Sequence, residues 1–299
     1  MHSTAVRTDE RAAGMLVDCR QIITDDEFRK LRTIIHRHTG ISLSDHKRAL
    51  VCSRLSRRLR HYQFTRYAQY YDFLCHADPD GVELMEMINA ITTNKTDFFR
   101  EAHHFKFLTE RVFPEQHKKN TRRLRLWSAA TSTGEEAYSL AITVREAFAN
   151  AEADVWDIKI LATDIDTRVL AHANAGIYTF EQASPIARPL LRRYFLKGTG
   201  DFSNRVCVKP TLKTLLRFRR LNLMDDPWPM HAPFDVIFFR NVLIYFDKAT
   251  QRRLLERMAG MLTPNGYLML GHAEAIHGFD HLYHAVGHSI YQSRAGRAV

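Results

Sequence analysis

The sequence predicts an α/β protein in which a doubly wound, mainly parallel sheet follows an all-helical N-terminal domain and carries a small antiparallel β insertion. Three observations support this fold. Only helical patterns occur before residue 122, units of strand, turn and helix repeat after it, and short β-type runs surround Gly198-Thr199-Gly200. With 299 residues, 45% hydrophobic and 25% charged, the chain has ordinary globular composition and the length for two domains.

The N-terminal part opens with a well-marked helix. Thr24-Asp25-Asp26-Glu27 has the form of a capping box, apolar residues follow at helical spacing, and Gly40 stands just past the expected end. Further helical patterns cover about 44–61, 66–76 and 82–92. The short connections between them favour a small all-helical domain.

From Leu124 on, strands alternate with helices. Leu124 to Ala130 is a short apolar run that ends in small residues, and helical spacing returns over Glu135 to Phe148. Further strands are expected over 158–162, 234–239 and, as the last strand, 267–270, and further helices from after Asp166 to about 175 and over 249–262. Such alternation implies a parallel sheet with its ligand sites at the carboxyl ends of the strands.

These patterns divide the chain into segments. We expect a frayed tail over 1–20, a helical domain over 21–92, a connector over 93–121 and an α/β domain over 122–295. The β-type runs Arg205 to Val208 and Leu215 to Phe218 put the antiparallel insertion at about 195–220.

Composition excludes several classes of protein. No run approaches the ~20 apolar residues of a membrane span, and Met1 to Arg20 lacks the apolar core of a signal peptide, so we expect a cytoplasmic protein. Histidine pairs such as His36/His38 and His103/His104 do not share a helix face, so no metal site is expected. The cysteines are widely spaced and are expected to be reduced thiols: Cys19, Cys52, Cys75 and Cys207.

Positive charge gathers on one predicted helix. The chain has 43 Lys and Arg against 33 Asp and Glu, a net charge of +10, which favours nucleic acid, anionic membrane or an acidic protein as partner. On a helical wheel of 44–61 the cationic or titratable arc holds Lys47, Arg54, Arg57, Arg58, Arg60 and His61, opposite Val51, Leu55 and Leu59. This face is either simply solvated or a docking surface, for which Arg54, Arg57 and Arg58 are the candidate residues.

The loop after the first strand predicts a ligand site. Ala129 to Gly134 is built of small residues, and the helix after it offers unpaired N–H groups. Glu135 and Glu136 would repel a pyrophosphate and suit an ammonium, although acids in a first turn also complement the helix dipole. Asp164 ends the second strand and can accept both hydroxyls of a ribose. Without a G-x-G-x-x-G motif, these residues fit S-adenosylmethionine better than a dinucleotide.

Five segments of the chain read as sequence motifs. They are Thr92 to Glu101, Trp127 to Glu136, Ala162 to Asp166, Phe234 to Asp247 and Gly271 to Glu274. Together, and in this order, they closely resemble the signature blocks of the CheR-type chemotaxis receptor methyltransferases. The resemblance covers about residues 22 to 292 and implies the doubly wound sheet of class I methyltransferases.

The resemblance also implies site residues. The implied cofactor contacts are Asn94, Thr96 and Arg100 at the methionine end, Glu136 at the amino group, Asp164 at the ribose, Asn222 and Leu223 beside the adenine, and Arg240 and Asn241 near the reactive methyl. The implied catalytic residues are Arg100, Arg240 and Tyr245. Arg100, Asn241 and Tyr245 each also have a purely structural interpretation. Thr131, Ala137 and Ala273 depart from the residues usual in relatives without removing a polar contact, so an active enzyme is expected.

The activity that the resemblance implies is S-adenosylmethionine-dependent formation of glutamate methyl esters on methyl-accepting chemotaxis receptors, which sets adaptation. A glutamate of pKa ~4.3 is already ionised at pH 7, so the transfer needs no general base. The acidic helical stalk of a receptor matches the basic helix. The protein is then expected as a cytoplasmic monomer at receptor clusters, with neither nucleic acid nor membrane insertion. In some relatives the insertion captures a C-terminal receptor peptide as an added strand; here it either does so or only braces the sheet.

Two other classes compete with this interpretation. A nucleic-acid methyltransferase would use the same basic helix on phosphates, but the sequence has no Asp/Asn-Pro-Pro-aromatic segment and no Pro-Cys nucleophile, and aromatic residues do not interleave with the basic face. A catalytically inactive binding module is the other class, and the complete set of cofactor residues speaks against it.

Overall fold

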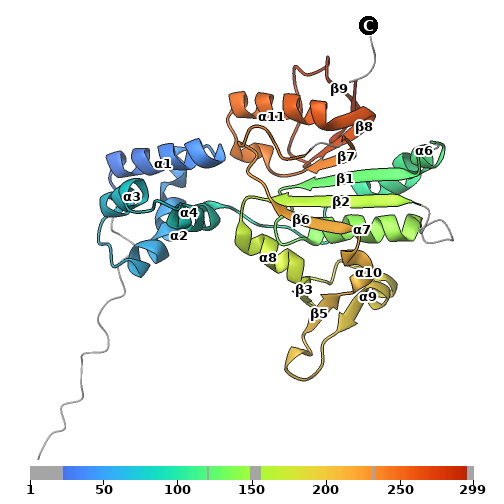
Figure 1. The fold of residues 1–299 in the computed structure, drawn as a ribbon, viewed down its shortest axis with the longest axis horizontal. Coiled ribbons are helices and arrows are strands. Elements are labelled where there is room, and N and C mark those ends of the chain that lie inside the picture. Colours follow the sequence, from blue (N-terminus) through green and yellow to red (C-terminus); the bar gives the residue numbers. More distant parts are fainter. Residues whose placement is uncertain (1–22, 120, 149–155, 231–232, 295–299) are drawn as a thin grey trace, which may run out of the picture. The chain divides into compact units, whose positions relative to one another are not determined.

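The computed structural model describes residues 23–119, 121–148, 156–230 and 233–294 and divides the chain into two units (Figure 1). The smaller unit consists of the chain up to Ile34 and of Leu43–Ile91, and the larger unit of Ile35–Ser42 and the chain from Thr92 on. The tail expected over 1–20, and Cys19 within it, lie outside the described residues.

The N-terminal helices begin and end close to the predicted positions. They are α1 Asp25–Thr39, α2 Arg48–His61, α3 Tyr67–His76 and α4 Val82–Ile91, with a short 3-10 turn, η1 Asp45–Lys47, before α2. The predicted capping box opens α1: Thr24 Oγ1 accepts the Glu27 N–H at 3.3 Å, and the Glu27 carboxylate accepts the Thr24 N–H at 2.9 Å. Gly40 follows the last turn at φ +72°, a conformation that strains other residues.

A buried ion pair fastens α2, α3 and α4 together. Glu83 of α4 is 1% exposed, and the Arg58 guanidinium of α2 donates to both of its carboxylate oxygens. The hydroxyls of Tyr70 and Tyr62 donate to the same carboxylate at 2.6 and 3.0 Å. The charge is therefore met by a cation and by four hydrogen-bond donors, which is the condition for burying a carboxylate.

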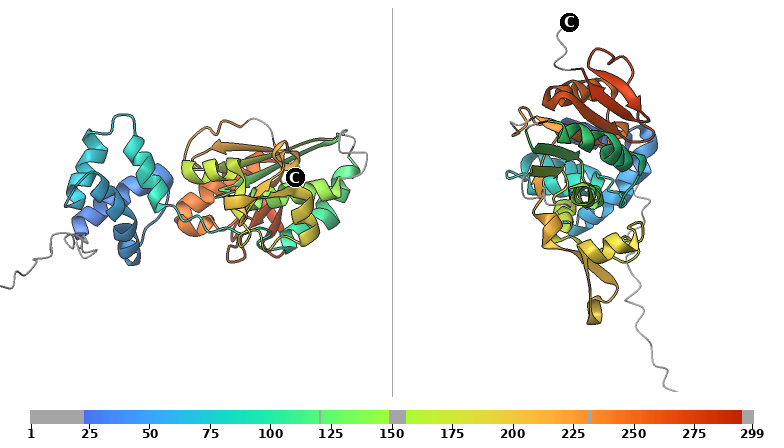
Figure 2. Two further views of the ribbon diagram at one scale, coloured as in Figure 1. Left: turned by 90° about the horizontal axis from the view of Figure 1, so that it is seen from below. Right: turned by 90° about the vertical axis from the view of Figure 1, so that its right-hand side faces the viewer.

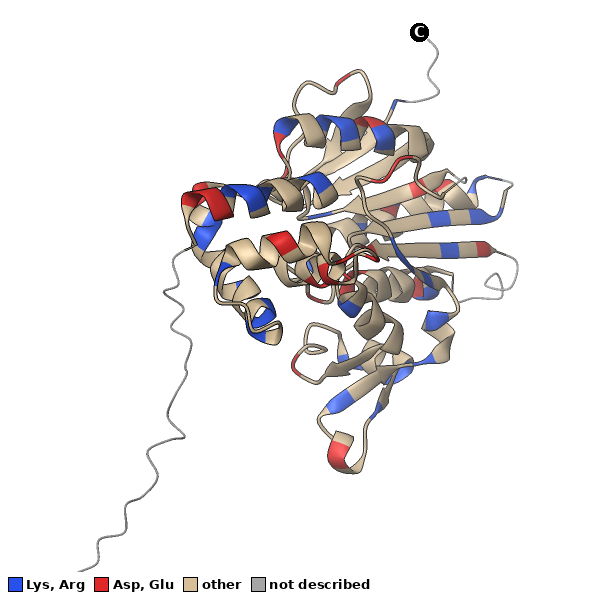
Figure 3. Ribbon diagram, turned by 60° about the vertical axis from the view of Figure 1, so that its left-hand side comes forward, with Lys and Arg blue, Asp and Glu red and all other residues tan. Residues whose placement is uncertain are grey.

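The cationic face of α2 is smaller than the helical wheel suggested. Its apolar positions are buried as predicted. Arg58 turns inward to Glu83, however, and Arg54 donates to the carbonyl of Ile91, whereas Arg57 is exposed. The other exposed members of the predicted cationic arc are Lys47, Arg60 and His61. Figure 3 colours the Lys and Arg positions of the chain blue, those on the N-terminal helices included.

The larger unit is built around a seven-stranded sheet of order β6-β2-β1-β7-β8-β10-β9. Its first five strands run parallel, and β10 is antiparallel to both of its neighbours. The bounds are β1 Arg123–Ala129, β2 Asp157–Asp164, β6 Leu216–Arg220, β7 Phe234–Phe239, β8 Leu262–Leu270, β9 Tyr283–Gly287 and β10 Ile290–Ser293. The strand order reverses between β1 and β7, so the predicted doubly wound fold is confirmed.

The prediction that Tyr267 to Leu270 is the last strand was wrong. That segment is the end of the longer β8, and β9 and β10 follow it. These two strands bury few positions, Tyr283 in β9 and Ile290 and Ser293 in β10. Their apolar pattern is correspondingly weak, and polar residues separate the buried positions.

Helices cover both faces of the sheet (Figures 1 and 2). On one face α7, Glu135–Ala147, packs in a core cluster with Leu126 of β1 and Phe238 of β7, and on the other α11, Lys248–Met261, packs with Trp127 and Leu268. A further helix, α8 Thr167–Ala175, contacts β2 and β6. Both faces of β7 are thus buried, which explains why all of its residues except Asp235 are apolar.

The segment predicted as a connector, 93–121, is largely helical. It contains α5 His103–Phe107, a π-helical turn η2 Leu108–Val112 and α6 Phe113–His117. Phe105, Leu108 and Val112 belong to the same core cluster as α7. This segment is therefore part of the α/β core rather than a spacer.

The antiparallel insertion exists, but its boundaries differ from the prediction. A three-stranded sheet of order β3-β5-β4 contains β3 Ile177–Thr179, β4 Phe195–Lys197 and β5 Arg205–Val208, accompanied by α9 Arg188–Tyr194, η3 Gly200–Phe202 and α10 Pro210–Lys213. The run Leu215 to Phe218 does not belong to it. That run contributes to β6, which pairs with β2 in the main sheet. Its buried residues Leu215 and Leu216 pack in the core cluster of that sheet.

Two further findings concern the predicted class of protein. In the part of the chain that the structure describes, no helix is both long enough and apolar enough to cross a membrane. Cys52, Cys75 and Cys207 are free thiols, as predicted for these three residues.

Arg58→Met should destabilise the protein strongly, because the Glu83 carboxylate would stay buried without its cationic partner. We expect the free energy of unfolding, measured by urea denaturation, to fall by ~3 kcal/mol. The matched control is Arg57→Met, one position along the same helix but exposed, which should change it by less than ~0.5 kcal/mol. Equal stabilities of the two variants would show that the buried pair does not hold the helices together.

Candidate functional site

The loop after β1 has a backbone that favours small residues. Ala130, Ser132 and Gly134 have φ values of +65°, +53° and +98°. A Cβ on Gly134 would lie 2.8 Å from the Cβ of Ala173 and 3.0 Å from the hydroxyl oxygen of Tyr178. Glycine is therefore required where the loop enters α7, and the predicted small-residue turn at a parallel strand end is confirmed.

Asp164 ends β2 and faces this loop. It is 6% exposed, and its two oxygens accept the N–H groups of Ser132 at 2.8 Å and of Asp166 at 3.0 Å. Burial raises the pKa of Asp164 to about 6, although these backbone hydrogen bonds oppose the shift. Each oxygen keeps a lone pair for a further donor.

Asp166 performs a structural task two residues later. Its side chain caps α8 by accepting the N–H groups of Arg168 and Val169. It also accepts hydrogen bonds from Thr92 Oγ1 at 3.0 Å and Asn94 Nδ2 at 2.8 Å. The carboxylate thereby holds the segment that carries Asn94 against α8, and the Asn94 carbonyl in turn accepts a hydrogen bond from Ser132 Oγ.

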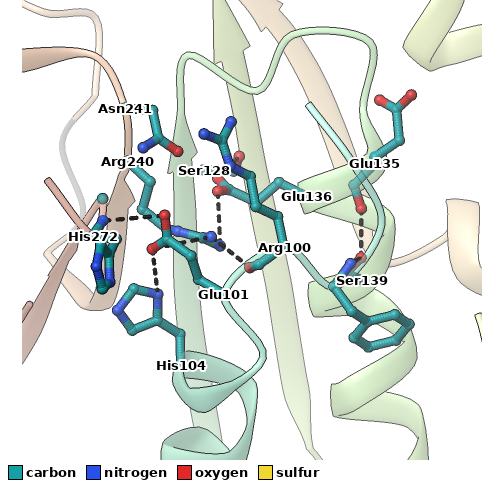
Figure 4. A network of polar contacts seen from close by, with 12 residues as sticks. Arg100, Glu101, His104, Ser128, Glu135, Glu136, Ser139, Arg240, Asn241 and His272 are labelled. Carbon is teal, nitrogen blue, oxygen red and sulfur yellow. Dashed lines mark hydrogen bonds and ion pairs between the residues drawn. The ribbon is translucent and has the colours of Figure 1, made fainter. Parts of the chain in front are cut away.

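Glu136, in the first turn of α7, lies between a hydroxyl and a guanidinium. Ser128 Oγ donates to one of its oxygens at 2.7 Å, and Arg240 Nη1 lies 3.3 Å from the other. Burial raises the pKa of Glu136, and the charge of Arg240 and the Ser128 hydrogen bond oppose the shift. The carboxylate is thus held in place at the carboxyl end of β1 (Figure 4).

Arg240 follows β7 and is the buried cation of the site. Its side chain is 2% exposed. Besides Glu136, it meets Glu101, whose Oε2 lies 3.4 Å from Nη2, and it donates to the carbonyl of Arg100. The guanidinium also lies 5.6 Å from the ring of Phe238. Two carboxylates and one cation therefore meet at the ends of β1 and β7 (Figure 4).

The loop after Arg240 is held by a third buried carboxylate. Asn241 has φ +58°, and its N–H donates to Glu274 at 2.8 Å. The same carboxylate accepts the N–H groups of Gly271 at 2.7 Å and Ile244 at 3.4 Å. A Cβ on Gly271 would lie 2.3 Å from Asn241 Nδ2. The Asn241 turn is thus packed tightly against the end of β8.

The remaining predicted residues lie around these groups. The Leu221 N–H donates to the Asp164 carbonyl at 3.0 Å, which brings the Asn222 and Leu223 segment to the end of β2. Asn222 Nδ2 donates to the carbonyl of His38 at 2.6 Å, and Leu223 is buried. The other predicted residues are Arg100, whose guanidinium donates to the Lys95 carbonyl, Thr96, which is half-buried, and Tyr245, half-buried in the turn η4 Leu243–Tyr245.

Three sets of contacts thus lie at neighbouring strand ends. Ser132 joins Asn94 to Asp164, Glu136 pairs with Arg240, and Asn241 is bound to Glu274. Sequence reasoning gave no role to four further members of these networks: Glu101, His104, Asp166 and Glu274. Three of them stand inside the quoted motifs, so a signal existed. His104 lies outside these motifs, and the sequence gave no signal for it. Its place beside the carboxylates depends on the backbone of Glu101, which has positive φ just before α5.

Comparison with known proteins identifies the family. Residues 94–291 match the family model described as the CheR methyltransferase SAM binding domain, and residues 26–92 match that of the CheR methyltransferase all-alpha domain. The chain belongs to the CheR methyltransferase family. Apart from Ile35–Ser42, which the structure groups with the larger unit, the two matches follow the two units, with the change between them near Ile91 and Thr92.

Curated CheR relatives are similar over most of their length. Chemotaxis protein methyltransferase 2 of Pseudomonas aeruginosa is 44% identical over 90% of this chain and 93% of its own. The chemotaxis protein methyltransferases of Salmonella typhimurium and Escherichia coli K12 are 40% and 39% identical, over 91% of this chain and 91% and 92% of their own. Over most of its length the chain is thus similar to curated proteins that are named chemotaxis protein methyltransferases.

The residues present fit the cofactor of the CheR domain, S-adenosyl-L-methionine. Asp164 keeps acceptor capacity on both oxygens, which suits a ribose diol. Glu136 and Glu101 meet only one guanidinium, and such an excess of carboxylates favours a cationic molecule. The cofactor prediction is confirmed, and the enzyme is an S-adenosylmethionine-dependent methyltransferase.

Proposed function

We propose that this CheR enzyme forms methyl esters on glutamate side chains of chemotaxis receptors. The observation that carries the proposal is the state of His104, the imidazole next to the buried carboxylates. Burial, assisted by Arg240, lowers the pKa of His104 to about 2, so it is too weak a base to take a proton from an alcohol or amine. A glutamate of pKa ~4.3 arrives already ionised and needs no base.

In this proposal the predicted residues bind the cofactor or orient the substrate carboxylate. S-adenosylmethionine supplies a methyl group made electrophilic by its sulfonium. Asp164 accepts the ribose hydroxyls, and Glu136 attracts the ammonium. The other proposed contacts are Asn94, Thr96 and Arg100 at the methionine end, Asn222 and Leu223 beside the adenine, and Arg240 and Asn241 near the methyl. Arg100, Arg240 and Tyr245 would orient the incoming carboxylate.

Alignment and exclusion of water would supply most of the catalysis. A carboxylate is a weak nucleophile when solvated, and holding two reactants in line is worth ~7–11 kcal/mol. The rigidity of the site suits this role: Arg240 is buried, and Glu274 fixes the backbone of Asn241. The positions of the polar groups are therefore set before a substrate arrives.

For the receptor we propose the exposed cationic face of α2. Arg57 and Arg60 are exposed on α2, His61 is exposed at its last residue, and Lys47 is exposed in η1 just before the helix. An acidic helical stalk is the complementary surface, and such charge pairing speeds association. Arg58 is better assigned to the core, since it is bound to Glu83.

The three-stranded sheet is a second candidate for receptor contact. Its exposed large apolar residues are Ile177, Phe180, Leu196 and Phe202, and both β3 and β4 have an open edge. An open edge beside apolar side chains favours addition of a peptide strand. We propose that a C-terminal receptor peptide binds there, which would raise the local concentration of methylation sites to roughly the millimolar range.

Methyl transfer from tritiated S-adenosylmethionine tests the function directly. Offered a receptor cytoplasmic fragment and an RNA separately, the enzyme should label the receptor alone, with radioactivity released by base as expected for an ester. Label on RNA, or a base-stable product, would contradict glutamate esterification.

The same assay separates docking from chemistry. Arg57→Glu with Arg60→Glu should lower receptor methylation at least tenfold and leave the affinity for S-adenosylhomocysteine unchanged. The charge-matched control is Arg217→Glu with Arg219→Glu on exposed positions of β6. If the α2 double variant methylated the receptor as well as the β6 control variant does, α2 would not be the docking surface.

Asp164→Asn should weaken S-adenosylhomocysteine binding at least tenfold at pH 8, because a charge-assisted hydrogen bond is worth ~1.5–3 kcal/mol. The pKa of Asp164 is raised to about 6, so its carboxylate loses charge, and the wild type loses this advantage, as the pH falls through 6. Calorimetry from pH 5 to 8 should therefore show the ratio of the two affinities shrinking toward acid. A constant ratio would place the ionisation of Asp164 outside cofactor binding.

Titration with C-terminal receptor pentapeptides ending in an aromatic residue tests the three-stranded sheet. Phe202→Ser should weaken binding at least fivefold, because this side chain is 61% exposed beside the sheet. Val82→Ser, at an equally exposed apolar position of the other unit, is the control. Absence of binding to any such peptide, with full activity on receptors that lack the tail, would leave the sheet as a brace.

A further inference from the structure

A cluster of metal-ligand side chains lies beside the methyl-transfer site. Ligand atoms of Glu101, His103 and His104 all lie within 4.8 Å of one another. The cluster forms where the chain enters α5: Glu101 has φ +57°, and His103 is the first helical residue. The helical spacing rule that argued against a metal site concerned histidine pairs such as His103/His104, and it left out Glu101, which precedes the regular helix.

The distances suit a small divalent ion. Glu101 Oε2 lies 3.6 Å from His104 Nδ1, and ligands bonded tetrahedrally at ~2.0–2.1 Å stand about 3.4 Å apart. His103 Nε2 lies 3.1 Å from the carbonyl oxygen of His288. A ligating imidazole commonly donates its second N–H to such a carbonyl, which fixes the ring and leaves the other nitrogen for the metal.

Buried atoms of the cluster lack hydrogen-bond partners. His104 is 0% exposed, and neither of its ring nitrogens has one among the described residues. Glu101 Oε2 likewise has no hydrogen-bond donor, although Arg240 lies near it. A neutral imidazole keeps a lone pair on one ring nitrogen, and the His104 ring therefore has an unused acceptor to offer an ion.

We propose that Glu101, His103 and His104 bind one divalent transition-metal ion of the zinc and cobalt class. Mixed imidazole and carboxylate ligands suit these ions better than Mg²⁺ or Ca²⁺. His103 is half-exposed and provides the access, while His104 forms the buried wall. The ion and the Arg240 guanidinium share Glu101 Oε2, whereas Glu101 Oε1 stays with the N–H of His272 at 3.1 Å.

Cobalt binding to the full chain tests the site. After treatment with a chelator, the protein is titrated with Co²⁺ and followed by its visible absorption, and Zn²⁺ is then added as competitor. We expect one equivalent of bound Co²⁺, displaced by Zn²⁺, and a rise in melting temperature with the metal. His103→Ala should weaken binding at least tenfold, whereas His277→Ala, at an exposed histidine outside the cluster, should leave it unchanged.

A second variant covers the carboxylate ligand. Glu101→Gln removes the charge and should also weaken Co²⁺ binding at least tenfold, with folding checked by circular dichroism. If it fails to fold, His103→Ala decides alone, since that side chain is half-exposed. The proposal would be overturned if the wild type bound Co²⁺ no more tightly than His103→Ala does. It would also be overturned if His277→Ala weakened Co²⁺ binding as much as His103→Ala. Either result would mean that scattered surface histidines bind the ion.

Discussion

The burial of one guanidinium constrains the whole candidate site. The Arg240 side chain is 2% exposed, and it is compensated by Glu136 at 3.3 Å, Glu101 at 3.4 Å and the carbonyl of Arg100. Removing a charge from water costs several kcal/mol unless partners replace the water. These partners come from α7 and from the segment before α5, so the end of β7 reaches its native arrangement only when both are in position. Assembly of the site is therefore part of folding the larger unit.

The acids after β2 show how neighbouring carboxylates acquire different tasks. Asp166 accepts hydrogen bonds from Thr92, Asn94 and the first turn of α8, so its oxygens serve the protein itself. Asp164 accepts backbone N–H groups, among them those of Ser132 and Asp166, and retains acceptor capacity. The first acid holds the chain in place, and the second faces the loop where a ligand can reach the backbone.

The local sequence pattern was enough to predict those elements whose conformation is set by residues close together in the chain. The run from β1 through Gly134 into α7 is readable because an apolar strand, small residues at positive φ and a helical repeat follow one another. Asp164 was predicted because a carboxylate at the end of a parallel strand can accept hydrogen bonds from the hydroxyls of a ribose. The capping box of α1 was readable for the same reason, since Thr24 and Glu27 bond to each other.

Features that depend on distant partners could not be predicted in this way. The helical wheel assigned Arg58 to a basic surface, but Glu83, 25 positions away, draws it into the core. The spacing rule was applied to the His103/His104 pair alone, so it missed that Glu101, at positive φ before α5, lies close to both imidazoles. The run Leu215 to Phe218 looked like a hairpin strand, and only its pairing with β2 decides otherwise. In each case a long-range contact overrides the local pattern.

The position of β10 matters while the protein is being synthesised. This strand lies between β8 and β9 and completes a backbone ladder on each side. The helical unit ends at Ile91 and can fold while the rest of the chain is still on the ribosome. The sheet, by contrast, lacks the strand that joins β8 to β9 until Ser293 has emerged, and an unpaired β8 edge recruits strands from other chains. Termination only a few residues before Ser293 would therefore yield an aggregating sheet rather than a slightly shorter enzyme.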